Sequence, residues 1–215
     1  MEKKRGEFIP ALNREWLTPL YDPLIRWTMR ESTFKPHLVR QAGIARGHRV
    51  LDLGCGTGTL TILIKQLHPD SEVVGLDIDR RILGVAREKI AAAGLAITLD
   101  QGDAARLPYA DHSCDRVLSS LVFHHLKRAE KIQAAREACR VLRPGGELHV
   151  ADFGRPHNLL MTGIVLIMRH FEETADNFAG RLPVIFRAAG FGQVEETERL
   201  GTAFGTLSLY RAAKA

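Results

Sequence analysis

The feature that most constrains the fold is a stretch in the first third of the chain, residues 50–58, with the sequence VLDLGCGTG. An apolar run of the kind that forms a buried strand leads directly into three glycines at alternate positions. Glycine lacks a Cβ and adopts positive φ readily, so a ligand can approach the backbone of such a turn closely. Thr59 begins an apolar helix whose first N–H groups face the same turn. The stretch therefore predicts a strand, a loop and a helix around a nucleotide-like ligand.

The spacing of the glycines separates two kinds of nucleotide site. A dinucleotide fingerprint reads G-x-G-x-x-G, and Thr59 stands where its third glycine would be. This disfavours an NAD-dependent oxidoreductase, which stays as the less favoured alternative. A second apolar run, VVGL, ends at Asp77. A carboxylate at the tip of the next parallel strand can accept hydrogen bonds from two ribose hydroxyls, so the pattern favours a nucleoside.

Further segments make the chain resemble the class I S-adenosylmethionine-dependent methyltransferases over roughly residues 45–153. The glycine turn is followed by QGDA and LP within 101–108, by CDRVLSS and LVFHHL within 114–126, and by LRPGGEL at 142–148, in that family's order. The resemblance implies S-adenosylmethionine as cofactor, with S-adenosylhomocysteine as product. It also implies that Asp103 accepts from the adenine amine, that the Ala104 N–H reaches the ring, and that Ser120 lies beneath the methionine end. The implied cofactor-binding residues are Asp52, Gly54, Cys55, Gly56, Thr57, Gly58, Asp77, Ile78, Asp103, Ala104 and Ser120.

Two residues of this set have a second interpretation. Asp52 either holds the glycine loop or meets the methionine amine through a water molecule. Cys55 is expected to fill space at the loop, as small buried cysteines do.

Within the class, the chain is most similar to the ubiquinone and menaquinone biosynthesis C-methyltransferases and their small-molecule relatives. GLDID at residues 75–79 and the early pair Tyr21-Asp22 carry this likeness. After residue 153 no substrate motif can be matched, so the resemblance implies a reaction class rather than an acceptor. We expect a small, apolar or aromatic acceptor, with a quinone precursor, a phenol and a lipid amine all open. A catalytically silent S-adenosylmethionine-binding protein is the other alternative.

Catalytic candidates follow from the chemistry of methyl transfer. Transfer from a sulfonium is an in-line displacement, so positioning and exclusion of water should dominate. A hydroxyl or acidic carbon must also lose a proton, and histidine suits that task near neutral pH. The candidates are His124 and His125, after the fourth strand, and Asp152, at the end of the fifth, with His124 preferred. Alternatively, either histidine satisfies backbone groups at a helix start, while Asp152 contacts the acceptor, orients a histidine or caps the next turn.

Alternating strand and helix patterns predict an α/β fold: a Rossmann-like, doubly wound, seven-stranded sheet with an antiparallel last strand and an N-terminal helical cap. We expect a single domain over residues 1–215, in which Pro19, Pro23 and Pro36 interrupt the helices of the cap. Gly94 is expected as the C′ residue of the helix after Asp79. The expected parts are the cap (1–46), a cofactor-binding core (47–153), a lid or substrate segment (154–180) and a C-terminal helix and strand pair (181–215). The expected strands are 48–53, 72–77, 96–100, 115–120, 146–152, 192–198 and 204–212, and the expected helices are 58–68, 79–93 and 127–142.

The segment at 154–180 contains the apolar run LLMTGIVLIM at 159–168, whose ten residues are too few to span a bilayer. The favoured interpretation is an ordinary buried helix. In the second interpretation the helix is a lid over a greasy acceptor pocket, and in the least favoured it rests on a membrane. The substrate candidates are Tyr21, His124, Met161, Val165 and His170.

The distribution of charged residues along the sequence indicates which kinds of partner to expect. The net charge of +5 comes from lysines and arginines spread among acidic residues, without the basic stripe of a nucleic-acid-binding face. Residues 119–123, SSLVF, also stand where nucleic-acid amino-methyltransferases carry an Asn or Asp, two prolines and an aromatic residue. We therefore expect a small-molecule substrate, no nucleic-acid partner, and a monomer or homodimer.

Compartment and metal use can also be anticipated. The first residues, MEKKRGE, lack the apolar core of a signal peptide, and no segment is long enough to span a membrane. We expect a cytoplasmic protein with at most peripheral membrane contact. Cys55, Cys114 and Cys139 have no C-x-x-C spacing and are expected to be reduced thiols. No cluster of His, Asp and Glu has the spacing of metal ligands, so no metal is expected.

Overall fold

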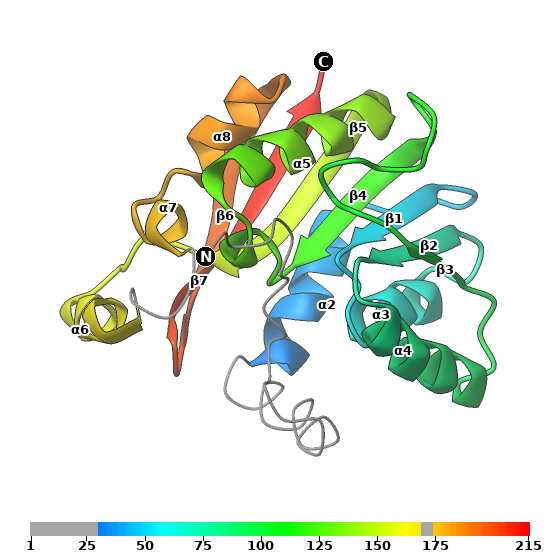
Figure 1. The fold of residues 1–215 in the computed structure, drawn as a ribbon, viewed down its shortest axis with the longest axis horizontal. Coiled ribbons are helices and arrows are strands. Elements are labelled where there is room, and N and C mark those ends of the chain that lie inside the picture. The colour runs from blue at the N-terminus through cyan, green and yellow to red at the C-terminus, as the bar shows by residue number, and fades with distance from the viewer. Residues whose placement is uncertain (1–29, 169–173) are drawn as a thin grey trace, which may run out of the picture.

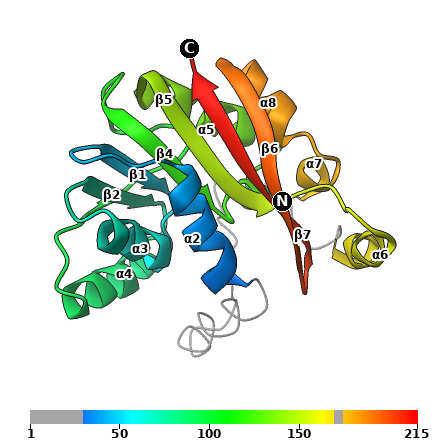
Figure 2. The same ribbon diagram turned by 180° about the vertical axis from the view of Figure 1, so that it is seen from behind.

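The computed structural model describes residues 30–168 and 174–215, which form one seven-stranded sheet with helices on both faces (Figures 1 and 2). In order across the sheet the strands are β3 (Thr98–Gln101), β2 (Glu72–Asp77), β1 (Arg49–Leu53), β4 (Cys114–Ser120), β5 (Leu142–Phe153), β7 (Gly205–Lys214) and β6 (Phe191–Thr202). The first five strands along the chain run parallel, and β7 lies antiparallel to both of its neighbours. The expected α/β class, the seven strands and the antiparallel last strand are confirmed.

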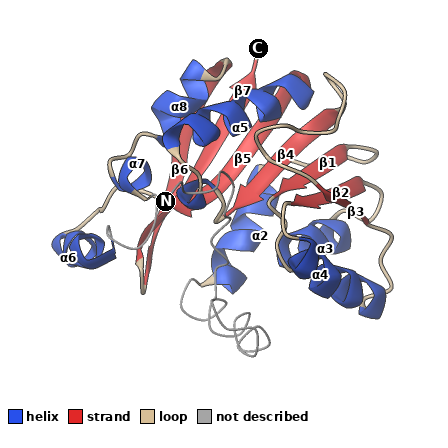
Figure 3. Ribbon diagram, viewed as in Figure 1, coloured by secondary structure: helices blue, strands red, loops and turns tan. Residues whose placement is uncertain are grey.

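Helices pack on both faces of this sheet (Figure 3). On one face, α2 (Glu31–Gln41) and α3 (Thr59–Leu67) bury their apolar side chains in a common cluster with the strands. On the other face, α5 (Arg128–Val141) and α8 (Leu182–Ala188) do the same in a second cluster. Between β2 and β3 runs α4 (Arg80–Ala92). The sheet is therefore the middle layer of three.

The central strands are buried on both sides, which explains their sequence. Because helices cover both faces of a parallel sheet, its strands are near-continuous apolar runs rather than alternating ones. Val50 and Leu51 are both fully buried, one in the α2 and α3 cluster and the other in the α5 and α8 cluster. Leu51 pairs with Val74 of β2 on one side and with Val117 of β4 on the other. This register aligns the carboxyl ends of β1, β2 and β4 at one edge of the sheet.

Most predicted boundaries agree with the structure to within two residues, and the exceptions have local causes. Strand β5 begins at Leu142 rather than at 146, because α5 runs directly into the strand and Leu142 pairs with Cys114. Strand β6 extends to Thr202, which pairs with Gly205 to close a hairpin with β7. Gly94 lies just beyond the C-cap of α4 with φ +64, so its prediction as the C′ residue is confirmed.

The interruption predicted at Pro36 is wrong. Pro36 lies inside α2, which continues to its end at Gln41. Proline has no N–H and costs the helix a hydrogen bond. The side chains of Phe34, Leu38 and Val39 are fully buried in the core, and this burial offsets that loss. The cap before residue 30, with Pro19 and Pro23, lies outside the described residues.

The described residues between β5 and α8 form two short helices beyond the sheet. They are α6 (Leu159–Met168) and α7 (Ala175–Phe178), and α6 lies at the outer edge of the molecule in Figures 1 and 2. Among the residues that the structure describes, none of the helices has the length and apolar character needed to cross a membrane.

Candidate cofactor and acceptor site

The glycine loop has a backbone that only glycine adopts without strain. Gly54, Gly56 and Gly58 have φ values of +72°, +54° and +76°. A Cβ on Gly54 would lie 2.4 Å from a methyl group of Val122, whereas a Cβ on Gly56 would meet nothing within 4 Å in residues 30–168 and 174–215. Two consecutive amides, those of Gly54 and Cys55, donate to the Leu76 carbonyl of β2 at 2.8 and 2.9 Å. The loop is thus fastened to the sheet on one side and open at Gly56.

Asp77 ends β2 directly beside this loop. Its Oδ2 accepts from the Gly56 N–H at 2.8 Å, and its Oδ1 accepts from the Asp79 N–H at 2.9 Å. Burial raises the pKa of Asp77, against the opposing effect of these N–H donors. Each carboxylate oxygen can accept a further hydrogen bond, as the ribose prediction requires. The next residue, Ile78, leaves 48% of its surface exposed, which gives this edge an apolar face beside the carboxylate.

The segment predicted to bind adenine lies next to Asp77. The Gly102 N–H donates to the Asp77 carbonyl at 3.0 Å, which joins the end of β3 to the end of β2. Asp103 is exposed, and its Oδ1 accepts from the Ala105 N–H at 2.8 Å. Ala104, the next residue after Asp103, is half-buried. The structure therefore brings together the two segments that were predicted to hold a nucleoside, and their residues fit an adenosine group.

Asp52, near the end of β1, and Cys55 lie on the buried side of the glycine loop. Asp52 is fully buried and accepts from the Thr61 hydroxyl of α3 at 2.6 Å, and burial raises its pKa to about 6. Of its two interpretations, this geometry favours holding the loop. The Cys55 thiol is buried near Gly75, whose added Cβ would lie 3.0 Å from Sγ, and burial raises its pKa far above the ordinary value. The packing role expected for Cys55 agrees with these contacts.

Thr57 has a partner that the sequence did not suggest. The Lys89 ammonium of α4 donates to the hydroxyls of Thr57 and Thr59 at 3.1 and 3.0 Å. This contact ties the loop to α4. Nothing in the sequence pattern marks Lys89, because the contact forms only when α4 packs beside α3.

At the end of β4 the chain makes a sharp bend. The Ser119 hydroxyl is buried and donates to the Leu53 carbonyl at 2.9 Å, so Ser119 fastens β4 to β1, while Ser120 is half-buried. Leu121 follows with φ +58, a strained value for a residue with a side chain, and its N–H donates to the Ala151 carbonyl at 2.8 Å. This bend leads into the short helix η2 (Phe123–His125).

The main catalytic candidates meet at this bend. His124 is buried, and its Nδ1 lies 2.9 Å from Oδ1 of Asp152. Asp152 is fully buried and also accepts from the Val122 N–H and the Phe153 N–H, at 3.0 and 2.7 Å. Burial alone would raise the pKa of Asp152, but the His124 ring and these hydrogen bonds hold it below its usual value. Of the alternatives for Asp152, the geometry favours orienting a histidine.

Asn177 of α7 is a further member of this group. Its amide nitrogen donates to Oδ1 of Asp152 at 3.0 Å, and its own Oδ1 is buried without a hydrogen-bond partner in the described residues. No motif in the sequence points to Asn177. His125 is exposed and stacks on His124, with ring centroids 3.9 Å apart.

Two of the substrate candidates, Met161 and Val165, lie on α6. A Cβ on Gly201 would lie 3.8 Å from Cε of Met161, and a Cβ on Gly205 would lie 3.7 Å from a methyl group of Val165. These contacts place one side of α6 on the β6–β7 hairpin, where Val165 packs against the same core cluster as Phe153. The favoured interpretation of an ordinary buried helix is wrong for the start of α6, where Leu160 is 69% exposed. Leu159, at the start of α6, is 91% exposed. Tyr21 and His170 lie outside the described residues.

The remaining predictions concern the cysteines and the side chains that could bind a metal ion. Cys55, Cys114 and Cys139 are buried free thiols. In residues 30–168 and 174–215, no three side chains of His, Cys, Asp or Glu are grouped to hold a metal ion.

Known proteins resemble this chain in sequence. A family model described as a methyltransferase domain matches residues 50–146. The demethylmenaquinone methyltransferase of Deinococcus radiodurans is 42% identical over 108 residues, covering 50% of this chain and 44% of that protein. The ubiquinone/menaquinone biosynthesis C-methyltransferase of Azotobacter vinelandii is 36% identical over 131 residues, covering 60% and 51%. The chain thus spans about half the length of these relatives.

Solved structures share the fold. The S-adenosylmethionine-dependent methyltransferase SibL superposes with a TM-score of 0.73 at 24% identity, covering 96% of this chain and 60% of that one. The [4+2]-cyclase SpnF superposes with a TM-score of 0.71 at 18% identity, covering 92% and 93%. At these identities the likeness concerns the fold alone.

One relative aligns over nearly its whole length. The demethylmenaquinone methyltransferase of Listeria monocytogenes is 30% identical over 224 residues, covering 89% of this chain and 91% of that protein. Together with the family model and a loop that fits adenosine, this alignment shows that the chain belongs to the S-adenosylmethionine-dependent methyltransferases.

Proposed function

We propose that this protein transfers a methyl group from S-adenosylmethionine to an oxygen or an acidic carbon of a small, apolar or aromatic acceptor. The observation that carries the proposal is the buried pair of His124 and Asp152, joined at 2.9 Å. A neutral amine is already a nucleophile, whereas a phenol or an acidic ring carbon has to lose a proton. A buried, oriented histidine therefore favours a phenol or a quinone precursor over a lipid amine.

The cofactor would be held by the loop and the strand ends described above. Gly56 would allow close approach to the backbone, Asp77 would accept from the ribose hydroxyls, and Asp103 and Ala104 would contact the adenine, with Ile78 against its face. When bound, S-adenosylmethionine supplies a methyl group that is activated by its positively charged sulfur. The protein's own contribution is then mainly to align the acceptor and exclude water.

His124 would act as the general base. Because its Nδ1 faces Asp152, the proton from the acceptor would pass to Nε2. The pKa of Asp152 is lowered despite its burial, so the carboxylate stays ionised near neutral pH and stabilises the imidazolium that forms. The donors Val122 N–H and Asn177 Nδ2 fix the carboxylate on two sides, at 3.0 Å each. Asp152 and Asn177 would thus be positioning residues for His124.

Apolar side chains next to the base support an apolar acceptor. The Phe153 ring lies 4.9 Å from the His124 ring, and the Phe178 ring lies 5.7 Å from Phe153, between centroids. Leu121 and Phe204 are partly buried against the same core cluster. The relatives named demethylmenaquinone methyltransferases make a reduced demethylquinone the first acceptor to test.

The test is a methylation assay with an acceptor panel. The protein is incubated with S-adenosylmethionine and a reduced demethylquinone, a set of phenols or a lipid amine, and mass spectrometry detects S-adenosylhomocysteine and the methylated product. We expect product from a quinone or phenol, and His124→Gln should lower kcat on the order of 10²- to 10⁴-fold. His68→Gln, at the far end of α3, is the matched control.

Three results would contradict parts of this proposal. Tight cofactor binding without product from any acceptor would favour the catalytically silent protein. Full activity of His124→Gln would exclude the base, and methylation of the lipid amine alone would exclude the acceptor class. The structural likeness to a protein named a cyclase is the reason to identify the product directly.

A further inference from the structure

Among the connections that join the parallel strands β1–β5, one lacks a helix in the described residues. The connections β1–β2, β2–β3 and β4–β5 each contain a helix, but residues 102–113, between β3 and β4, contain none among the residues the structure describes. This segment, which we call the adenine loop, contains Asp103 and Ala104 near its start. A loop without regular hydrogen bonds depends on side chains from elsewhere for its conformation.

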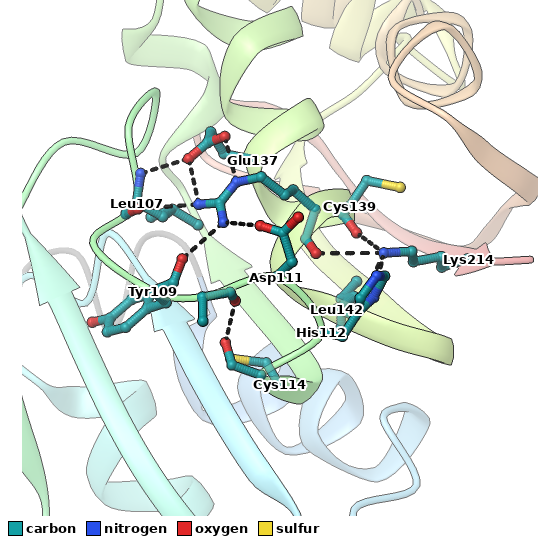
Figure 4. Close-up of polar contacts among 12 residues, drawn as sticks. Leu107, Tyr109, Asp111, His112, Cys114, Glu137, Cys139, Leu142 and Lys214 are labelled. Carbon is teal, nitrogen blue, oxygen red and sulfur yellow. Dashed lines mark hydrogen bonds and ion pairs between the residues drawn. The ribbon is translucent and has the colours of Figure 1, made fainter.

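Two of those side chains, Glu137 and Arg140, come from α5. Oε2 of Glu137 accepts from the Leu107 N–H at 2.8 Å. The Arg140 guanidinium donates to the Leu107 carbonyl at 3.1 Å, to the Tyr109 carbonyl at 2.8 Å and to Oδ1 of Asp111 at 2.7 Å. Figure 4 shows Glu137 of α5 beside Leu107, with Tyr109 and Asp111 close by. Two residues thus bind the backbone and a side chain of the adenine loop at four points.

The two residues also bind each other. Nε and Nη2 of Arg140 donate to the two carboxylate oxygens of Glu137, at 2.8 Å each. The hydrogen bond from Arg140 lowers the pKa of Glu137, and Glu137 followed by Asp111 raises that of Arg140. Both groups therefore stay charged across the physiological range, and bidentate pairing fixes the plane of the guanidinium.

The far end of the loop is fastened separately. The His112 N–H donates to the Arg140 carbonyl at 3.1 Å. The Lys214 ammonium of β7 donates to the Cys139 and Leu142 carbonyls, at 2.6 and 2.7 Å, and lies 3.2 Å from Nδ1 of His112 (Figure 4). Loss of the Glu137 and Arg140 contacts would therefore loosen the loop around Leu107, while its end stays in place and the Tyr109 hydroxyl still donates to Oδ2 of Asp100 at 2.9 Å.

We propose that Glu137 and Arg140 are positioning residues for the cofactor, which hold the adenine loop in the conformation that recognises the adenine ring. This inference rests on the adenine contacts proposed for Asp103 and Ala104. If the loop samples other conformations, the apparent affinity falls by the fraction of molecules that keep the competent one. The pair of His124 and Asp152 lies at the ends of β4 and β5, outside the adenine loop, so the chemical step should be spared.

The test measures binding rather than turnover. S-adenosylhomocysteine and adenosine are titrated calorimetrically into wild type, Arg140→Met, Arg140→Lys and Glu137→Gln, at a temperature where circular dichroism shows each variant folded. We expect Arg140→Met to raise Kd for both ligands at least about tenfold, with Arg140→Lys intermediate because lysine keeps the charge but not the fork. Faster hydrogen exchange of the Leu107 amide should accompany the loss. Arg136→Met, which removes the same charge from an exposed position of α5, is the matched control and should bind as wild type.

Each outcome decides the proposal. Unchanged Kd in Arg140→Met, with or without faster exchange at Leu107, overturns it. If Arg140→Met does not fold, Glu137→Gln decides, because glutamine keeps the size of the side chain and loses only the charge-assisted pairing. In variants that fold, a fall in kcat at saturating S-adenosylmethionine with unchanged Kd would also overturn it. Wild type that binds S-adenosylhomocysteine but methylates no acceptor would refute the proposed function and leave this inference standing.

Discussion

Two alanine substitutions in the glycine loop, Gly54→Ala and Gly56→Ala, distinguish the role of these glycines in packing from their role in cofactor binding. Gly54 and Gly56 both have positive φ, so each substitution by alanine carries a backbone cost of about 1–2 kcal/mol. At Gly54 the new methyl would also lie 2.4 Å from Val122, and such overpacking costs a further ~1–3 kcal/mol. Gly54→Ala should therefore lower the free energy of unfolding by about 2–5 kcal/mol, and Gly56→Ala by only about 1–2 kcal/mol.

Cofactor binding is tested by the milder of the two substitutions, Gly56→Ala. The Gly56 methyl would meet no atom of the described residues within 4 Å, so it would occupy space on the open side of the loop. We expect folded Gly56→Ala to bind S-adenosylhomocysteine at least about tenfold more weakly, a loss of about 1.4 kcal/mol. Urea unfolding measures the first effect and calorimetric titration the second. Equal destabilisation by the two variants would refute the packing reasoning, and wild-type affinity in Gly56→Ala would refute close approach of the cofactor to the loop.

Three further variants test individual parts of the structure. Burial raises the pKa of Asp52 to about 6, so the stability linked to its protonation is fully present below about pH 4 and is lost as pH rises through 6. Relative to Asp52→Asn, the free energy of unfolding of wild type should fall by up to about 3 kcal/mol between pH 4 and 7, as measured by urea titration. A difference between the two proteins that does not depend on pH would contradict this. Asn177→Ala removes a donor from buried Asp152 and should cost about 1–3 kcal/mol in unfolding free energy and lower kcat with a quinone or phenol, whereas unchanged kcat would exclude a positioning role. Gly75→Ala would place a methyl 2.8 Å from Leu99 and should destabilise by about 1–3 kcal/mol in thermal melts, with a wild-type Tm as the contrary result.

The parts of the fold that the sequence predicted well are those set by burial and local geometry. The runs around Val50 and Val73 are apolar because both faces of their strands are covered, and this leaves a strong pattern. The glycine loop and Gly94 needed only backbone conformations that glycine alone adopts easily. The interruption at Pro36 failed because propensity is a local term, and tertiary burial of the surrounding helix outweighed it.

The candidate site was predictable to the level of strand ends. His124 and Asp152 were placed at the ends of neighbouring strands, but their pairing depends on the register that sets Ser120 beside Ala151. Asn177 and Arg140 were missed because each acts on residues about 25–30 positions away along the chain, and no local pattern encodes such a contact. The packing of Met161 likewise depends on where the last hairpin lies.

The measurement that tests the central claim most directly is calorimetric titration of S-adenosylmethionine, and separately of NADH, into wild type and Asp77→Ala. Asp77 joins β2 to the glycine loop and is the proposed acceptor for the ribose hydroxyls. We predict one-to-one binding of S-adenosylmethionine to wild type, strong loss of that binding in Asp77→Ala, and no binding of NADH. Binding of NADH, or S-adenosylmethionine affinity that survives the loss of Asp77, would contradict the site described here.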